Sequence, residues 1–151
     1  MYHYLLIFHS YYRWLVLLAL ISQLLWLYLN QKNNSIFKIN HFKCVVVFTL
    51  IYDIQLISGW WLYLNSPIIL GFWHDAALGV KNRQLRFFGI EHNTMMTLAV
   101  LMINLFTIKV KSKIGENGFN YLWKRYLWIT VFILSSIPWS FSPFTSRPNW
   151  R

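Results

Sequence analysis

The sequence predicts an all-α protein, a four-helix transmembrane bundle. Two observations predict it: four apolar runs that are each long enough to cross a bilayer, and a very low content of charged residues. Hydrophobic residues make up 57% of the chain and charged residues only 12%, which is about half the charged fraction of an average soluble domain. The short segments between the runs hold most of the Lys, Asn and Gly residues.

The apolar runs contain about 19 to 25 residues each, and a helix needs about 20 apolar residues to cross the bilayer core. Stretches such as MMTLAVLMINLF are apolar around most of a helical circumference, whereas a helix of a soluble bundle carries a polar stripe. We therefore expect one integral membrane domain over residues 1–151. The expected spans are Leu5–Leu29, Phe42–Leu64, Phe87–Ile108 and Tyr121–Trp139.

The net charge of +10 does not indicate a nucleic-acid partner, because the basic residues stand at the ends of the runs and between them. They are a topology signal instead, since cytoplasmic segments of membrane proteins are rich in Lys and Arg. If the helices alternate in direction, one side holds eight basic residues and the other five, which predicts an inner-membrane protein with both termini periplasmic. The eight are Lys32, Lys38, Lys43, Lys109, Lys111, Lys113, Lys124 and Arg125, and the five are Lys81, Arg83, Arg86, Arg147 and Arg151.

The longest connection between runs, residues 65–86, contains the sequence SPIILGFWHDAALGV. It is apolar and aromatic enough to lie on the outer membrane surface or to fold back as a short helix. The connection at residues 30–41 is polar and reads as a cytoplasmic loop, and the one at residues 109–118 as a basic turn.

Most ionisable side chains within the runs are predicted to lie in the outer half of the membrane or near its middle. At about 1.5 Å of rise per residue, His9 lies about 6 Å and Arg13 about 12 Å from the outer end of the first run. Asp53 lies about 16 Å deep by the same measure, and Glu91 and His92 about 8 Å. The inner halves of the runs are almost free of ionisable groups.

Charged side chains within a membrane face the interior of the protein and find partners there. Asp53 and Glu91 are the acids within the runs, so we expect Arg13 to pair with one of them, and Asp53 matches its depth best. Such a pair could serve only to fix the packing of the helices. Gln55 stands two residues after Asp53, so the two side chains should point to opposite sides of their helix.

His9 and His92 stand on different helices at similar depth. Two imidazoles on facing helices can bind the iron of a haem from opposite sides. Arg13 lies one turn below His9, and it or Arg83 and Arg86 could meet the haem propionates. A plain packing role for each histidine is the alternative.

Other sites have weaker sequence support. His3, His74 and Asp75 together with His9 and His92 could build a metal site at the outer surface, although no short His-x-His or His-x-x-x-His spacing supports it. The chain contains no Gly-rich phosphate loop, nucleophile elbow or HExxH motif, so no hydrolase or transferase reaction is indicated.

Four short motifs carry a resemblance to a known family: HSYYRW, DIQLISGWWLY, RFFGIEHNTMM and SSIPW. Together they resemble a family of small four-span membrane proteins of Bacteroidota that is often labelled cytochrome b-like. In that family the second motif usually begins with a histidine, and here Asp53 stands at that position. The resemblance therefore implies haem b as a cofactor and leaves His9 and His92 as the candidate ligands.

The leading hypothesis is a small b-type cytochrome-like or respiratory-associated membrane subunit that takes part in electron transfer. Its expected partners are the lipid bilayer and a membrane protein or a quinone. The cofactor-binding residues would be His9, His92 and Arg13, beside a buried polar cluster of Asp53, Gln55 and Glu91. A structural or assembly subunit without a cofactor is one alternative. A small proton-linked transporter that works through Asp53, Glu91 and His92 is the other.

Overall fold

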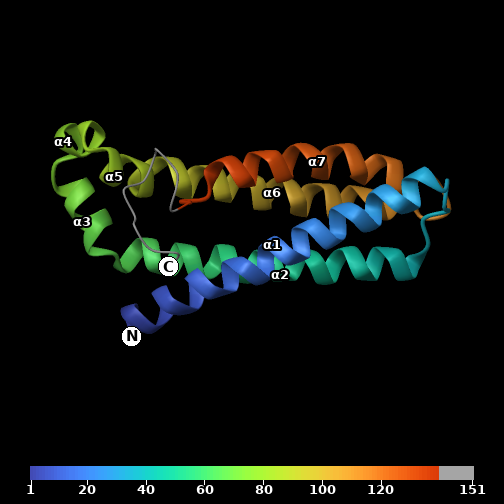
Figure 1. Ribbon diagram of the computed structural model, residues 1–151, viewed down its shortest axis with the longest axis horizontal. Helices are drawn as coiled ribbons and strands as arrows, with labels where there is room; N and C mark the ends of the chain where they lie inside the picture. Colours follow the sequence, from blue (N-terminus) through green and yellow to red (C-terminus); the bar gives the residue numbers. More distant parts are fainter. Residues whose placement is uncertain (140–151) are drawn as a thin grey trace.

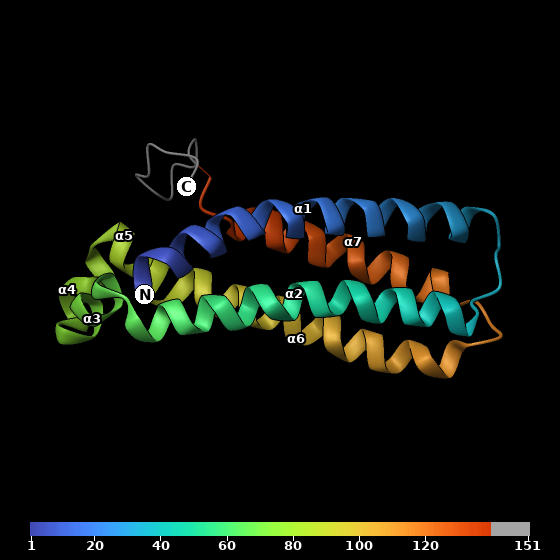
Figure 2. The same ribbon diagram turned by 90° about the horizontal axis from the view of Figure 1, so that it is seen from below.

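The computed structural model describes residues 1–139, and all the regular structure in that range is helical. Four long helices run side by side along the molecule (Figure 1). α1 contacts α2 and α7, and α6 contacts the same two helices (Figure 2), so that the four enclose a shared core. The expected all-α class is confirmed. The long helices are α1 (Tyr2–Lys32), α2 (Ile39–Asn65), α6 (His92–Val110) and α7 (Gly118–Ser136).

Three helical segments are long and apolar enough to cross a membrane: Tyr2–Lys32, Ile39–Asn65 and Arg83–Lys113. They contain the first three spans expected from the sequence. α7 is 19 residues long and carries Lys124 and Arg125 within its first half, which lowers its hydropathy. The membrane assignment therefore stands on these three helices.

Large apolar side chains cover the outside of the long helices. Leu18 is 67% exposed, Ile57 68% and Trp128 72%. Contiguous apolar surface of this kind is rare on soluble monomers, and helices that satisfy their own backbone hydrogen bonds can present it to lipid. The exterior therefore fits a membrane environment.

The segment after α2 folds into three short helices, as the sequence analysis allowed: α3 (Pro67–His74), α4 (Ala76–Lys81) and α5 (Arg83–Arg86). α2 ends before Pro67, because the residue preceding a proline disfavours helical geometry, and the proline then opens α3. Asp75 and Asn82 cap α4 and α5 by accepting hydrogen bonds from backbone N–H groups. These helices cover one end of the molecule, here called the capped end (Figure 1).

Phe72 holds the capped end together. Its ring is buried, and it packs against the backbone of Gly79 and of Gly89, where added Cβ atoms would each lie 2.7 Å from ring carbons. Gly89 belongs to a π-helical turn, η1 (Phe87–Glu91), which joins α5 to α6, and its carbonyl accepts a hydrogen bond from the Tyr63 hydroxyl at 2.9 Å. Such turns occur often at functional sites, and this one leads directly into His92.

The opposite end, here called the basic end, contains the α1–α2 connection and the α6–α7 connection. The two connections are joined by backbone hydrogen bonds: Phe37 N–H donates to the Glu116 carbonyl at 3.1 Å, and Gly115 N–H donates to the Phe37 carbonyl at 2.8 Å. The Phe37 ring is fully buried and lies edge-on to Phe119, with ring centroids 5.1 Å apart. It also lies directly on Gly118. The two turns thus form one packed unit.

Candidate ligand site

A cavity of about 170 Å³ lies among the four long helices toward the capped end. His9 and Arg13 line it from α1, Gln55 from α2, and His92 from the first turn of α6, while α7 contributes apolar side chains. The structure thus brings the three residues expected to bind a cofactor to one cavity. Its volume suits a single substituted ring, since a cavity of about 150 Å³ holds benzene, and it is smaller than the roughly 300–1,000 Å³ of sites for drug-sized ligands.

The hydrogen bonds around His9 assign its neutral tautomer. The Ser58 hydroxyl donates to the Gln55 carbonyl at 2.9 Å, so its oxygen accepts the contact from His9 Nδ1, also at 2.9 Å. Nδ1 therefore carries the proton, and Nε2 carries the lone pair. The Gln55 amide nitrogen lies 3.3 Å from this Nε2.

His92 has the same tautomer for a simpler reason. Its Nδ1 lies 2.9 Å from the backbone carbonyl of Ser136, and a carbonyl can only accept a hydrogen bond. Nδ1 thus carries the proton and Nε2 the lone pair. This contact joins the first turn of α6 to the last turn of α7, and a backbone acceptor on Nδ1 is also the usual support of a histidine that binds a metal.

Gln55 adds a third acceptor to the cavity wall. Its amide nitrogen donates to the His9 carbonyl at 3.1 Å, which fixes the orientation of the amide. Its Oε1 atom is buried and has no hydrogen-bond partner among residues 1–139. Buried polar atoms are nearly always hydrogen-bonded in native proteins, so this oxygen marks a position where a ligand or a water donor belongs.

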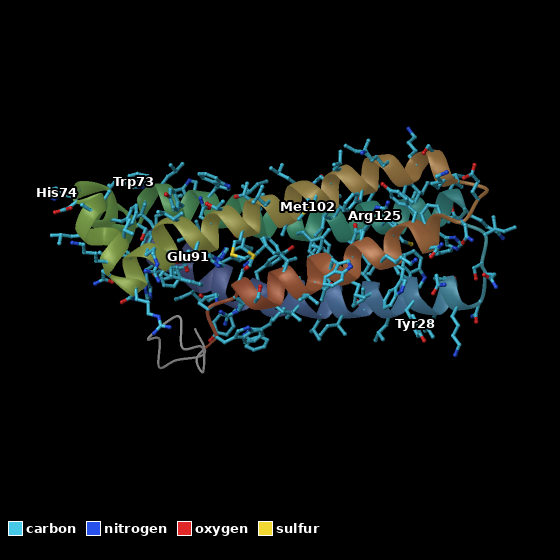
Figure 3. All side chains as sticks on the ribbon, turned by 90° about the horizontal axis from the view of Figure 1, so that it is seen from above. Tyr28, Trp73, His74, Glu91, Met102 and Arg125 are labelled. Carbon is cyan, nitrogen blue, oxygen red and sulfur yellow. The ribbon has the colours of Figure 1, made fainter. Side chains whose placement is uncertain are left out.

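The two acids that were expected to pair with Arg13, Asp53 and Glu91, contact other residues instead. Glu91 pairs with Arg86 of α5 at 2.7 Å, and Asp53 accepts a hydrogen bond from the Asn104 amide at 2.7 Å. The predicted divergence of Asp53 and Gln55 is confirmed, because Asp53 faces α6 and Gln55 faces α1. Glu91 therefore belongs to the capped end (Figure 3), and the expected polar cluster divides into separate contacts.

Arg13 remains a wall of the cavity. Its guanidinium carbon lies 5.3 Å from the centroid of the Trp14 ring, a cation–π distance. Arg83 and Arg86, the other proposed propionate partners, stand in α5 at the capped end.

A layer of buried hydroxyl and amide groups, which was not among the sites expected from the sequence, lies deeper in the core. The Tyr52 hydroxyl donates to Gln23 Oε1 at 2.7 Å. Thr107 lies 2.8 Å from Thr49 and 3.3 Å from the Tyr126 hydroxyl, measured between oxygens. All five side chains are buried, and they come from all four long helices. They are scattered over four runs that hold other polar residues as well, so the sequence carries no pattern that links them.

A metal site of the kind considered for the outer surface is not found, since residues 1–139 contain no group of three or more His, Cys, Asp or Glu side chains placed to hold a metal ion. This finding does not bear on a haem, which needs only two axial ligands.

Comparison with known proteins adds no further guide, because no protein-family model, no curated protein and no solved structure matches this chain.

Proposed function

We propose that this protein is a small respiratory-associated membrane subunit that binds the ring of a quinol in the cavity between His9 and His92. The observation that carries the proposal is the buried, unpartnered Oε1 of Gln55 in the wall of a cavity that His9 and His92 also line. A ligand that matches this oxygen must donate a hydrogen bond. A quinol is a single ring with two hydroxyl donors, and it resides in membranes.

In this proposal the histidines accept the protons of the quinol and a partner protein accepts its electrons. Oxidation of a quinol to a quinone releases two electrons and two protons. An imidazole Nε2 can accept a proton from a quinol hydroxyl, which is ordinary general-base chemistry; at His9 the hydroxyl would take the place of the Gln55 amide contact. The electrons would pass to a one-electron carrier, a haem or an iron–sulfur centre, in a membrane protein partner.

The proposed membrane arrangement has four spans, with α7 as the fourth. A helix of 19 residues extends about 28 Å, close to the thickness of about 30 Å of the hydrocarbon core. The excess of Lys and Arg at the basic end supports placing that end in the cytoplasm and the cavity near the periplasmic side of an inner membrane. Arg147 and Arg151, which entered the charge comparison, lie outside the described residues.

The proposal predicts that His9→Leu and His92→Leu each weaken binding of a short-chain quinol by about tenfold, the loss expected for one hydrogen bond to a buried group. Quenching of tryptophan fluorescence in the detergent-purified protein measures the affinity. His74→Leu is the matched control, because His74 is an exposed histidine at the end of α3. Absence of quinol binding to the wild type, or an equal loss in the control, would contradict the proposal and favour a structural subunit.

Gly59→Val tests the position of the His9 ring without removing a hydrogen-bonding group. A Cβ at Gly59 would lie 3.0 Å from His9 Cε1, so the branched side chain must displace the imidazole from Ser58 and Gln55. We expect quinol affinity to fall about tenfold, as in His9→Leu. The same fluorescence titration measures the quinol affinity of this variant. An unchanged affinity would show that the contacts of the His9 ring with α2 do not contribute to binding.

Haem b is a second candidate, favoured by the shared tautomer of His9 and His92, since both leave Nε2 for an iron. If it bound, these two residues would hold it, and it would supply one-electron transfer. The volume of the cavity argues against it, because a tetrapyrrole is far larger than the single ring that about 170 Å³ accommodates, and the helices would have to move apart. A Soret absorbance band in the purified protein would decide for haem.

The proton-linked transporter gains little support from the core. Leu27, Val45, Val110 and Leu122 are fully buried between the cavity and the basic end. An apolar layer of this kind does not favour a continuous path for protons or solutes.

A further inference from the structure

A second hollow lies on the outside of the molecule, in the groove between α6 and α7, with a volume of about 520 Å³. Its walls are apolar, with Met102 and Phe106 on α6 and Trp128 and Phe132 on α7. Arg125 lies at the end nearer the basic end and Ser135 at the other. The two are ten residues apart on α7, so the groove extends about 15 Å along the helix axis. Figure 3 labels Met102 and Arg125 on the two helices that border it.

Arg125 is held in a fixed position. Its guanidinium carbon lies 3.8 Å from the centroid of the Tyr121 ring and 5.5 Å from that of Phe106. One of its terminal nitrogens donates to the Tyr121 carbonyl at 2.7 Å, one turn closer to the basic end. A guanidinium has five N–H donors in a planar fork, so this single bond leaves donors for an anion.

The guanidinium of Arg125 reaches back toward the headgroup region of a membrane. Arg125 stands seven residues after the first residue of α7, which is about 10 Å along the helix. Its side chain extends back toward the helix start, as Arg side chains near membrane surfaces do. Lys109 and Lys124, both exposed, add positive charge near the same end. An apolar groove that begins at such a cluster complements the acyl chain and the negative charge of a phospholipid with an anionic headgroup.

We propose that this groove is a binding site for an anionic phospholipid, with the phosphate on Arg125 and one acyl chain between α6 and α7. Basic sites between membrane helices on the cytoplasmic side are known to take anionic lipid headgroups, and Arg recognises phosphate through its planar fork. The site is separate from the cavity of His9 and His92 and does not depend on quinol binding.

The test is native mass spectrometry of the detergent-purified protein with phosphatidylglycerol or phosphatidylcholine of matched chain length. We expect the wild type to bind phosphatidylglycerol about tenfold more tightly, the preference given by a charge-assisted hydrogen bond. Arg125→Gln should abolish the preference. Lys124→Gln should retain it, because Lys124 carries the same charge on the same helix but does not line the groove.

A second variant tests the groove if Arg125→Gln fails to fold. Ser135→Trp fills the far end with an indole ring, so it should weaken binding of phosphatidylglycerol while Arg125 stays in place. The proposal is overturned if the wild type shows no preference, if Lys124→Gln loses as much as Arg125→Gln, or if Ser135→Trp binds as the wild type does. It is also overturned if inorganic phosphate at the same concentration displaces the lipid, because the site would then be one for a free anion.

Discussion

Replacement of Gly118 by valine is expected to remove most of the folded protein. A Cβ at Gly118 would lie 2.5 Å from Cγ and 2.8 Å from Cβ of Phe37. The Phe37 ring cannot move away from the added side chain, because it is fully buried against Phe119 and His41. Overpacking of a core costs about 1–3 kcal/mol or more, and we expect about 3 kcal/mol here because Phe37 also holds the two turns of the basic end together.

The measurement for Gly118→Val is thermal unfolding of the detergent-purified protein, read from the loss of its monodisperse peak on size exclusion. Gly71→Ala is the matched control. Gly71 lies in helix α3, it is exposed, and an added Cβ there meets nothing within 4 Å. Alanine is favoured over glycine in helices by up to about 1 kcal/mol, so this variant should be as stable as the wild type or slightly more so. Equal stability of Gly118→Val and the wild type would mean that the packing of Phe37 is not as described.

Replacement of Gly89 by valine is expected to open the capped end. A Cβ at this position would lie 2.7 Å from Phe72 Cγ, at the root of a buried ring. The carbonyl of Gly89 also accepts a hydrogen bond from the Tyr63 hydroxyl, so a shift of η1 would break this hydrogen bond as well. We expect a loss of about 1–3 kcal/mol from overpacking, with a further loss from the hydrogen bond.

A double-mutant cycle with Phe72→Ala isolates the clash in Gly89→Val. Removal of the ring removes the obstacle, so the added cost of Gly89→Val should be much smaller in the Phe72→Ala protein, which is the signature of two residues in contact. Thermal unfolding of the four proteins measures this coupling. Additive losses would show that the effect of Gly89→Val comes from the π-helical backbone rather than from Phe72.

The long apolar runs predicted the helices well because length and hydrophobicity alone decide whether a segment can cross a membrane. Depth along a helix also follows from counting residues, which is why His9 and His92 meet at one cavity. Rotation about the helix axis does not follow from counting. Asp53 matched Arg13 in depth, but it faces Asn104 of α6.

Local irregularity hid the partner of Glu91. Arg86 stands five residues before Glu91, a spacing that regular helices do not bring together. The π-helical turn between them allows the contact, and nothing in the sequence announces that turn. The contacts of Ser58 and Ser136 with the histidines were equally hidden, since a backbone carbonyl or a lone serine gives no pattern, and these contacts decide which imidazole nitrogen faces a ligand.

The main-chain bonds between Phe37, Gly115 and Glu116 have a mechanical consequence. They join the α1–α2 connection to the α6–α7 connection, so the two helix pairs are held together at the basic end. At the capped end the same two helix pairs are joined through α3, α4 and α5, so both ends of the bundle resist their separation.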